Sequence, residues 1–136
     1  METVIILSRP IKTTILGRTR SGKTRYSLKH AVSTASQEIL FISDELTALE
    51  FGAITSQVFE GSKISYDYPS GIIIDDYCRI TFRTKRDVET NGNFVMYDTV
   101  VVDICEGFKF EYVDFARDNY IVTGQFNSSD KFIILD

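Results

Sequence analysis

The stretch that decides the fold is Gly17-Arg18-Thr19-Arg20-Ser21-Gly22-Lys23-Thr24, which fits the pattern G-x-x-x-x-G-K-[ST] at every fixed position. A short stretch of strand-forming residues over 13–16 precedes it, and apolar residues at helical spacing follow it over 28–35. The two glycines permit backbone conformations that a Cβ would obstruct, so main-chain N–H groups can point inward at an anion. The sequence therefore predicts a strand, a phosphate-binding loop and a helix, in that order.

This pattern is the Walker A motif of P-loop nucleotidases. In such a loop Lys23 would reach the β- and γ-phosphates, and the Thr24 hydroxyl would hold Mg²⁺. The helix that begins at Gly22 directs the positive end of its dipole at the same anion. We therefore expect ATP and Mg²⁺ as ligands, with the phosphates surrounded by Gly17, Arg18, Thr19, Arg20, Ser21, Gly22, Lys23 and Thr24.

A second acidic element is expected to hold the metal at the end of an apolar strand. Val100-Val101-Val102-Asp103 supplies it, so Asp103 is the Walker B candidate and joins Thr24 as a metal residue. The alternative interpretation is a buried strand that ends in a solvated aspartate.

Two further segments resemble DnaB-type replicative helicases and RecA-like recombinases, including phage helicases. Ser43-Asp44-Glu45-Leu46-Thr47 is similar to the segment in which those families carry a catalytic glutamate, which implies that Glu45 activates the attacking water. The stretch 120–127 is similar to their strand that ends in a glutamine near the γ-phosphate, which implies that Gln125 senses this phosphate. The alternative interpretation is that Glu45 is an acidic residue in the first turn of a helix, where it interacts favourably with the helix dipole, and that Gln125 is an ordinary loop residue.

The resemblance covers about 11–136 and implies a fold class and a function. The fold class is α/β, a mainly parallel sheet flanked by helices with a RecA-like core, in a single P-loop nucleotide-binding domain over 1–136. The implied function is that of an ATPase with catalytic Lys23, Glu45 and Gln125, acting in DNA replication or recombination, self-associating, and minimal or viral. The 21 residues between Asp103 and Gln125 are too few for the long DNA-binding loop of those families.

Composition and charge limit the kinds of partner that the chain can bind. A chain of 136 residues has the size of one domain, and its net charge of −4 excludes a domain-wide basic field for nucleic acid. Residues 1–30 nevertheless carry seven basic residues and one acidic residue, which suits a local phosphate site. No apolar run reaches the length of a membrane span and no signal peptide is evident, so we expect a cytoplasmic protein, in the host cytoplasm if viral. Cys78 and Cys105 are too isolated to predict a disulfide framework or a zinc site.

Three other classes of nucleotide-binding protein compete with the ATPase interpretation. A GTPase is disfavoured, because no Asn-Lys-x-Asp motif is present. A small nucleoside or nucleotide kinase stays open, since a basic cluster could clamp phosphates or could simply be solvated; it comprises Arg79, Arg83, Lys85 and Arg86. A nucleotide-gated regulatory or binding module with little turnover is the third possibility.

The remaining elements are predicted from periodicity and turn residues. A helix capped by Ser43 or Asp44 should end near Gly61 and bury Leu46, Leu49, Ala53, Ile54 and Val58. Asn91-Gly92 is expected to close a hairpin, and a short helix is expected over 108–117. The total is roughly seven strands and three helices.

Overall fold

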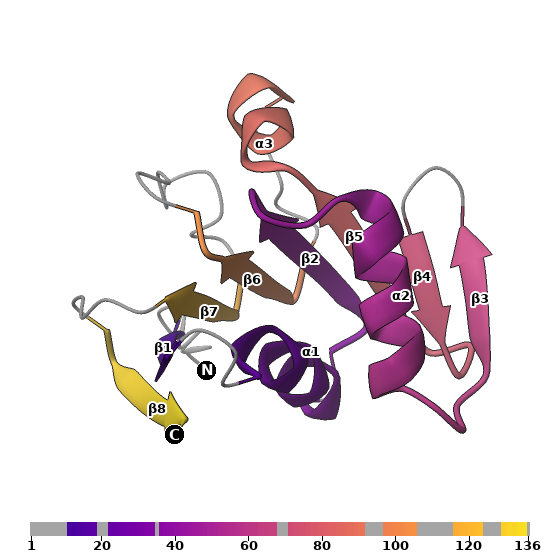
Figure 1. The fold of residues 1–136 in the computed structure, drawn as a ribbon, viewed down its shortest axis with the longest axis horizontal. Helices are drawn as coiled ribbons and strands as arrows, with labels where there is room; N and C mark the ends of the chain where they lie inside the picture. Colours follow the sequence, from indigo (N-terminus) through magenta and orange to yellow (C-terminus); the bar gives the residue numbers. More distant parts are fainter. Residues whose placement is uncertain are drawn as a thin grey trace, which may run out of the picture.

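The computed structural model describes residues 11–18, 22–34, 36–67, 71–91, 97–105, 116–123 and 129–135. This part of the chain contains eight strands and three helices (Figure 1). In chain order they are β1 (Ile11–Gly17), α1 (Lys23–Ser33), β2 (Glu38–Ser43), α2 (Ala48–Val58), β3 (Ile64–Asp67), β4 (Gly71–Ile74), β5 (Cys78–Arg83), α3 (Lys85–Asn91), β6 (Thr99–Asp103), β7 (Asp118–Thr123) and β8 (Lys131–Leu135).

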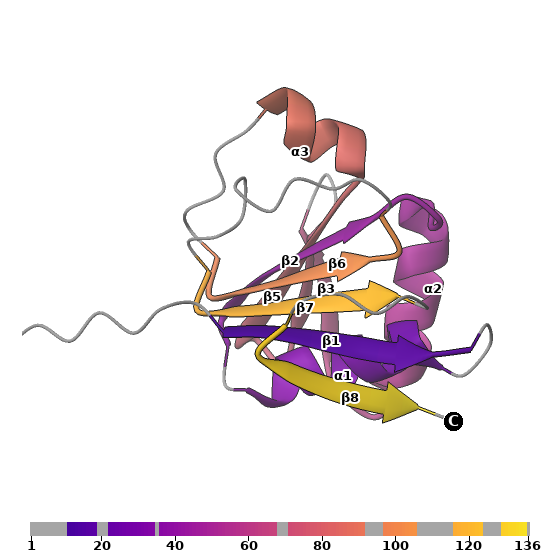
Figure 2. The same cartoon turned by 90° about the vertical axis from the view of Figure 1, so that its left-hand side faces the viewer.

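The strands form one sheet in the order β3-β4-β5-β2-β6-β7-β1-β8. All neighbours from β5 to β8 are parallel, and Figure 2 shows β1, β2, β6, β7 and β8 pointing the same way. At the other end, β3 and β4 are antiparallel, and so are β4 and β5. Because β7 lies between β1 and β6, a single strand separates β1, which ends at Gly17, from the strand that carries Asp103.

The expected fold class is wrong. We expected a helix-flanked RecA-like α/β core, but the described residues form a strand-rich mixed sheet with only three short helices, of 11, 11 and 7 residues. The difference arises largely after α2, where the chain folds back as the antiparallel strands β3, β4 and β5 in place of further helix-strand units. None of the helices in the described ranges is long and apolar enough to cross a membrane.

The tight turn between β4 and β5 explains why this extension is antiparallel. Asp75 and Asp76 have φ of 53° and 55°, the left-handed backbone that such hairpin turns require and that Asp tolerates better than most residues. The Tyr77 N–H donates to the Ile74 carbonyl at 3.0 Å and closes the turn. The prediction that Asn91-Gly92 closes a hairpin is wrong for Asn91, which is the last residue of α3, and Gly92 lies outside the described residues.

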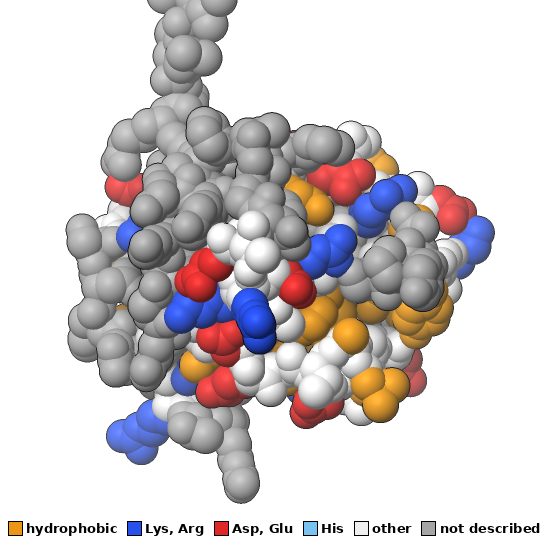
Figure 3. Space-filling model, turned by 90° about the horizontal axis from the view of Figure 1, so that it is seen from above, with side chains coloured by type: hydrophobic (Ala, Val, Ile, Leu, Met, Phe, Trp, Pro, Cys, Tyr) orange, Lys and Arg blue, Asp and Glu red, His pale blue; other side chains and the backbone are white. Residues whose placement is uncertain are grey.

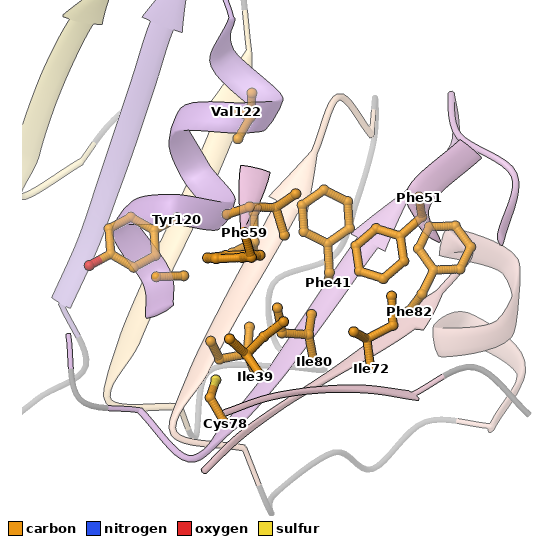
Figure 4. Packing of buried hydrophobic residues seen from close by; sticks show 14 of the residues in the cluster. Ile39, Phe41, Phe51, Phe59, Ile72, Cys78, Ile80, Phe82, Tyr120 and Val122 are labelled. Carbon is orange, nitrogen blue, oxygen red and sulfur yellow. The ribbon is translucent and has the colours of Figure 1, made fainter. Parts of the chain in front are cut away.

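Buried side chains cover both faces of the sheet. Between the sheet and helices α1 and α2, the Phe51 ring lies 5.1 Å from Phe41 and 5.0 Å from Phe82, measured between centroids (Figure 4). On the opposite face, Val88 of α3 packs with Leu40 and the neighbouring apolar residues of β2 and β6. Burial on both faces explains why β2 and β6 are continuous apolar runs rather than alternating ones.

Helix α2 begins later than the sequence predicts, and its predicted buried face is only partly right, because Leu46, Ile54 and Val58 do pack against the core as partly buried residues. Its N-cap is Thr47, whereas Ser43 belongs to β2 and Asp44 to the connecting turn. Phe51 and Thr55 are its buried residues, while Leu49 is 85% exposed and Ala53 is also exposed. The prediction of a buried Leu49 and Ala53 is therefore wrong. The helix expected over 108–117 lies outside the described residues except for its last two positions.

Thr47→Ala is expected to lower the free energy of unfolding by about 1 kcal/mol, the usual cost of losing a helix cap. The Glu50 N–H donates to the Thr47 hydroxyl at 3.1 Å, and the Thr47 N–H donates to the Glu50 carboxylate at 3.2 Å. Urea denaturation monitored by circular dichroism measures the change. Thr47→Ser keeps the hydroxyl and should stay close to wild type; an equal loss in both variants would contradict the role of the cap.

Candidate nucleotide-binding site

The N-terminus of α1 presents its backbone donors without a side-chain cap. Gly22 is the N-cap residue, with φ of 84°, and no acidic residue follows in the first turn. This left-handed backbone favours glycine, although a Cβ at this position would meet no atom within 4 Å. Because the first N–H groups of a helix have no partner within it, this end of α1 can accept an anion.

Lys23 is held beside the start of the loop. Its side chain is buried, and Nζ donates to the Gly17 carbonyl at 2.5 Å and to the Arg18 carbonyl at 3.3 Å. Both carbonyls belong to the point where β1 ends and the loop begins, so the ammonium lies at the carboxyl edge of the sheet. Arg18 itself is exposed.

Asp103 and Thr24 meet at the same edge. The Thr24 hydroxyl donates to Oδ1 of Asp103 at 2.8 Å, and the Ser43 hydroxyl donates to Oδ2 at 3.0 Å. Asp103 is only 1% exposed, so the two hydroxyls replace water as hydrogen-bond donors to its carboxylate. The predicted pair of metal residues, 79 positions apart in the chain, is thus in direct contact.

Opposing effects act on the Asp103 carboxyl. Burial is the largest of them and raises its pKa above the ordinary value of an aspartate, and the nearby Glu45 charge adds to this. The hydroxyls of Thr24 and Ser43 and the Lys23 ammonium act in the opposite direction, because they stabilise the ionised form. A cation placed here would also favour the carboxylate.

The backbone turns sharply directly after Asp103. Ile104 has φ of 50°, a left-handed conformation that is strained for a β-branched residue. Its N–H donates to the Val122 carbonyl of β7 at 3.0 Å, which ties this turn to the neighbouring strand. The end of β6, and Asp103 with it, is therefore held in place by β7.

Glu45 lies on the same edge, two residues after β2 ends. Its side chain is exposed, and its charge acts on Asp103. Its N–H donates to the Ser43 hydroxyl at 3.2 Å. Two residues of the basic cluster lie at opposite ends of β2. The Lys85 charge acts on the Cys105 thiol near this edge and lowers its pKa. Arg79 lies at the other end, where its Nε is 4.0 Å from the Glu38 carboxylate.

The structure thus brings together Gly17, Gly22, Lys23, Thr24, Glu45 and Asp103 at the carboxyl edge of the parallel strands. Thr19, Arg20, Ser21 and Gln125 lie outside the described residues. Ser43 was missed as a site residue, because the sequence suggested it only as a helix cap. The signal that could have found it is its place at the end of β2, where it pairs in register with Asp103.

The donor set of this edge fits Mg²⁺ bound together with a phosphate. Thr24 and Asp103 offer a hydroxyl and a carboxylate, and Mg²⁺ in nucleotide sites takes few protein oxygens and completes its shell with phosphates and water. Within the described ranges, no three His, Cys, Asp or Glu side chains gather as a metal cluster.

The two thiols are expected to react slowly in the folded chain. Burial raises the pKa of Cys78 to about 11 and that of Cys105, whose Sγ donates to the Asp103 carbonyl at 3.5 Å, to about 12. Since the thiolate is the reactive form, iodoacetamide at pH 8 should label both at least tenfold more slowly than in urea, where a free thiol has a pKa of about 8.5. Mass spectrometry of timed samples measures the rates. Native Cys105 that is labelled as fast as in urea would contradict this environment.

Comparisons with family models, with curated proteins and with solved structures gave no match. The interpretation of the site therefore depends on its own geometry and on the sequence pattern.

Proposed function

We propose that the chain binds ATP with Mg²⁺ at the carboxyl edge formed by β1, β2 and β6, and hydrolyses it. The observation that carries the proposal is the contact between Thr24, the second residue of a helix with a left-handed Gly22 cap, and the buried Asp103 carboxylate. A triphosphate with its metal ion requires backbone donors at a helix N-terminus, a cationic side chain and a carboxylate that can hold the metal, and this edge of the sheet offers all three.

The phosphates would be bound by charge and by backbone donors. The carbonyls of Gly17 and Arg18 take two of the three N–H donors of the Lys23 ammonium, and a phosphate oxygen would take the third. The first N–H groups of α1 lack a side-chain cap and favour an anion through the helix dipole. Mg²⁺ would neutralise charge on the phosphate oxygens, and Thr24 and Asp103 are the residues that would hold it.

Glu45 is proposed as the general base. In that role it removes a proton from water while the water oxygen forms a bond to the γ-phosphorus. The bond between this phosphorus and the bridging oxygen breaks, the electron pair stays on that oxygen, and ADP and phosphate leave. The exposure of Glu45 suits this role, because the residue must reach a solvent-derived nucleophile.

Nucleic acid receives weaker support as a partner. On the face shown in Figure 3, basic and acidic side chains of the described residues are interspersed. The part of this face that the structure describes therefore offers no single basic field for a polyphosphate backbone. Stimulation of turnover by single-stranded DNA is the observation that would add DNA as a partner.

The test is titration of the purified protein with ATP by calorimetry, with Mg²⁺ and with EDTA, followed by measurement of phosphate release. Saturable binding that weakens in EDTA, together with phosphate release in the absence of any acceptor substrate, is expected for an ATPase. Binding without release would support a nucleotide-gated module or a kinase instead. Absence of binding under both conditions would overturn the proposal.

A further inference from the structure

Ser43 connects two parts of the candidate site that the sequence treats separately. It is the last residue of β2, it is fully buried, and it pairs in register with Asp103 of β6. Beyond it the chain leaves the sheet toward Glu45. The residue therefore lies between the carboxylate proposed to hold the metal and the loop proposed to carry the general base.

The hydrogen bonds of the Ser43 hydroxyl are complete and their direction is fixed. A hydroxyl has one donor and two acceptor positions. The N–H groups of Glu45, at 3.2 Å, and of Leu46, at 3.3 Å, can only donate, so they occupy both acceptor positions. The single O–H must then donate to Asp103, at 3.0 Å, and an ionised carboxylate can only accept.

We propose that Ser43 is a positioning residue that fixes the Glu45 loop relative to the Asp103 carboxylate. The inference rests on the proposed function and deepens it, since it assigns a role to a residue that would touch neither water nor phosphate. The Glu45 side chain is exposed, so its place is set through its backbone, and the backbone is bound to Ser43. Loss of the hydroxyl would remove the acceptor of both backbone N–H groups and, with it, their link to Asp103.

Ser43→Ala should therefore reduce kcat for ATP by about tenfold to a hundredfold, the size of effect that a misplacement of about 1 Å can produce. The KM for ATP and its Kd should change much less than kcat, because the phosphate contacts of Lys23 and α1 stay in place and Asp103 keeps its hydrogen bond from Thr24. Ser36→Ala is the matched control. Ser36 is a buried serine just before β2, at the opposite end of that strand, and its hydroxyl forms a hydrogen bond with the Thr99 hydroxyl at 2.5 Å. The kcat of Ser36→Ala should equal that of wild type.

A double-mutant cycle separates positioning from a merely structural role. If Ser43 acts through Glu45, adding Ser43→Ala to Glu45→Gln should leave kcat unchanged, because the group to be positioned has already lost its function. Additive losses, or equal losses in kcat for Ser43→Ala and Ser36→Ala, would overturn the inference while leaving the ATPase proposal intact. A wild-type chain that binds no ATP would instead overturn the proposed function and this inference with it.

A second variant keeps the inference testable if the Ser43→Ala protein does not fold. Ser43→Cys is nearly isosteric but is a weak hydrogen-bond donor and acceptor. Its kcat per folded molecule should lie between those of wild type and Ser43→Ala, or below wild type if the alanine variant is unfolded. A wild-type kcat in Ser43→Cys would overturn the role of the hydroxyl.

Discussion

Lys23→Ala is expected to weaken ATP binding by about 10- to 150-fold, which corresponds to about 1.5–3 kcal/mol for a hydrogen bond to a charged group. The loss should fall on the triphosphate, because the ammonium lies at the loop start beside Gly17 and Arg18. AMP, which lacks the β- and γ-phosphates, should lose much less. Calorimetric titration of both variants with ATP and AMP measures the difference.

Lys29→Ala is the matched control for this change. Lys29 lies on the same helix and is exposed, and it lies beyond the N-terminal turn that Gly22 caps. Its variant removes the same charge and should bind ATP as wild type does. Equal weakening by the two substitutions would mean that net charge, rather than the loop geometry, governs binding, and would contradict the assigned site.

Glu45→Gln is expected to lower the rate of ATP hydrolysis by about 100- to 10,000-fold, the range that a general base contributes. Glutamine has nearly the same shape but cannot take a proton, so ATP binding should persist. Phosphate release measured beside ATP affinity separates the two effects. With Mg²⁺ present, the variant should retain bound ATP long enough to be isolated with it.

Glu60→Gln makes the same charge change at the end of α2, where Glu60 is exposed. It should hydrolyse ATP at the wild-type rate. Turnover that survives Glu45→Gln would rule out Glu45 as the base and direct attention to Glu106, which follows the Asp103 strand in the sequence.

Much of the geometry of the candidate site could be predicted, because it depends on local sequence. Gly22, Lys23 and Thr24 follow a strand and begin a helix, as their pattern predicts. Asp103 ends the apolar strand β6, as expected from the run of valines. The contact between Thr24 and Asp103 needed only the general rule that carboxyl ends of parallel strands share an edge.

The fold class could not be predicted, because it depends on elements with weak local signals. Helix α3 has one apolar residue, Val88, which is fully buried against β2, so no periodic pattern marks it. β3 has four residues, and its Tyr66 is 69% exposed. The antiparallel hairpin depends on Asp75 and Asp76, whose left-handed backbone is set by the turn rather than by a glycine signal.

The buried face of α2 was predicted only in part, for a related reason. Leu49 and Ala53 satisfy a helical period, but so do Phe51 and Thr55, and a short helix rich in apolar residues has more than one possible buried stripe. Packing of Phe51 against Phe41 and Phe82 decides between them. These partners come from β2 and β5, so the choice is made by tertiary structure.

The placement of β1 has a consequence for the order of folding during synthesis. β1 pairs with β7, Ile11 opposite Asp118, and with β8, Thr13 opposite Lys131. At roughly 5–20 residues per second, β1 leaves the ribosome about 5–20 s before either neighbour exists. Such non-local parallel pairing is slow, because chain entropy is lost before any contact is gained. Thr24 and Asp103 belong to segments made far apart in time, so a nucleotide that needs both can bind only after β6 has been synthesised.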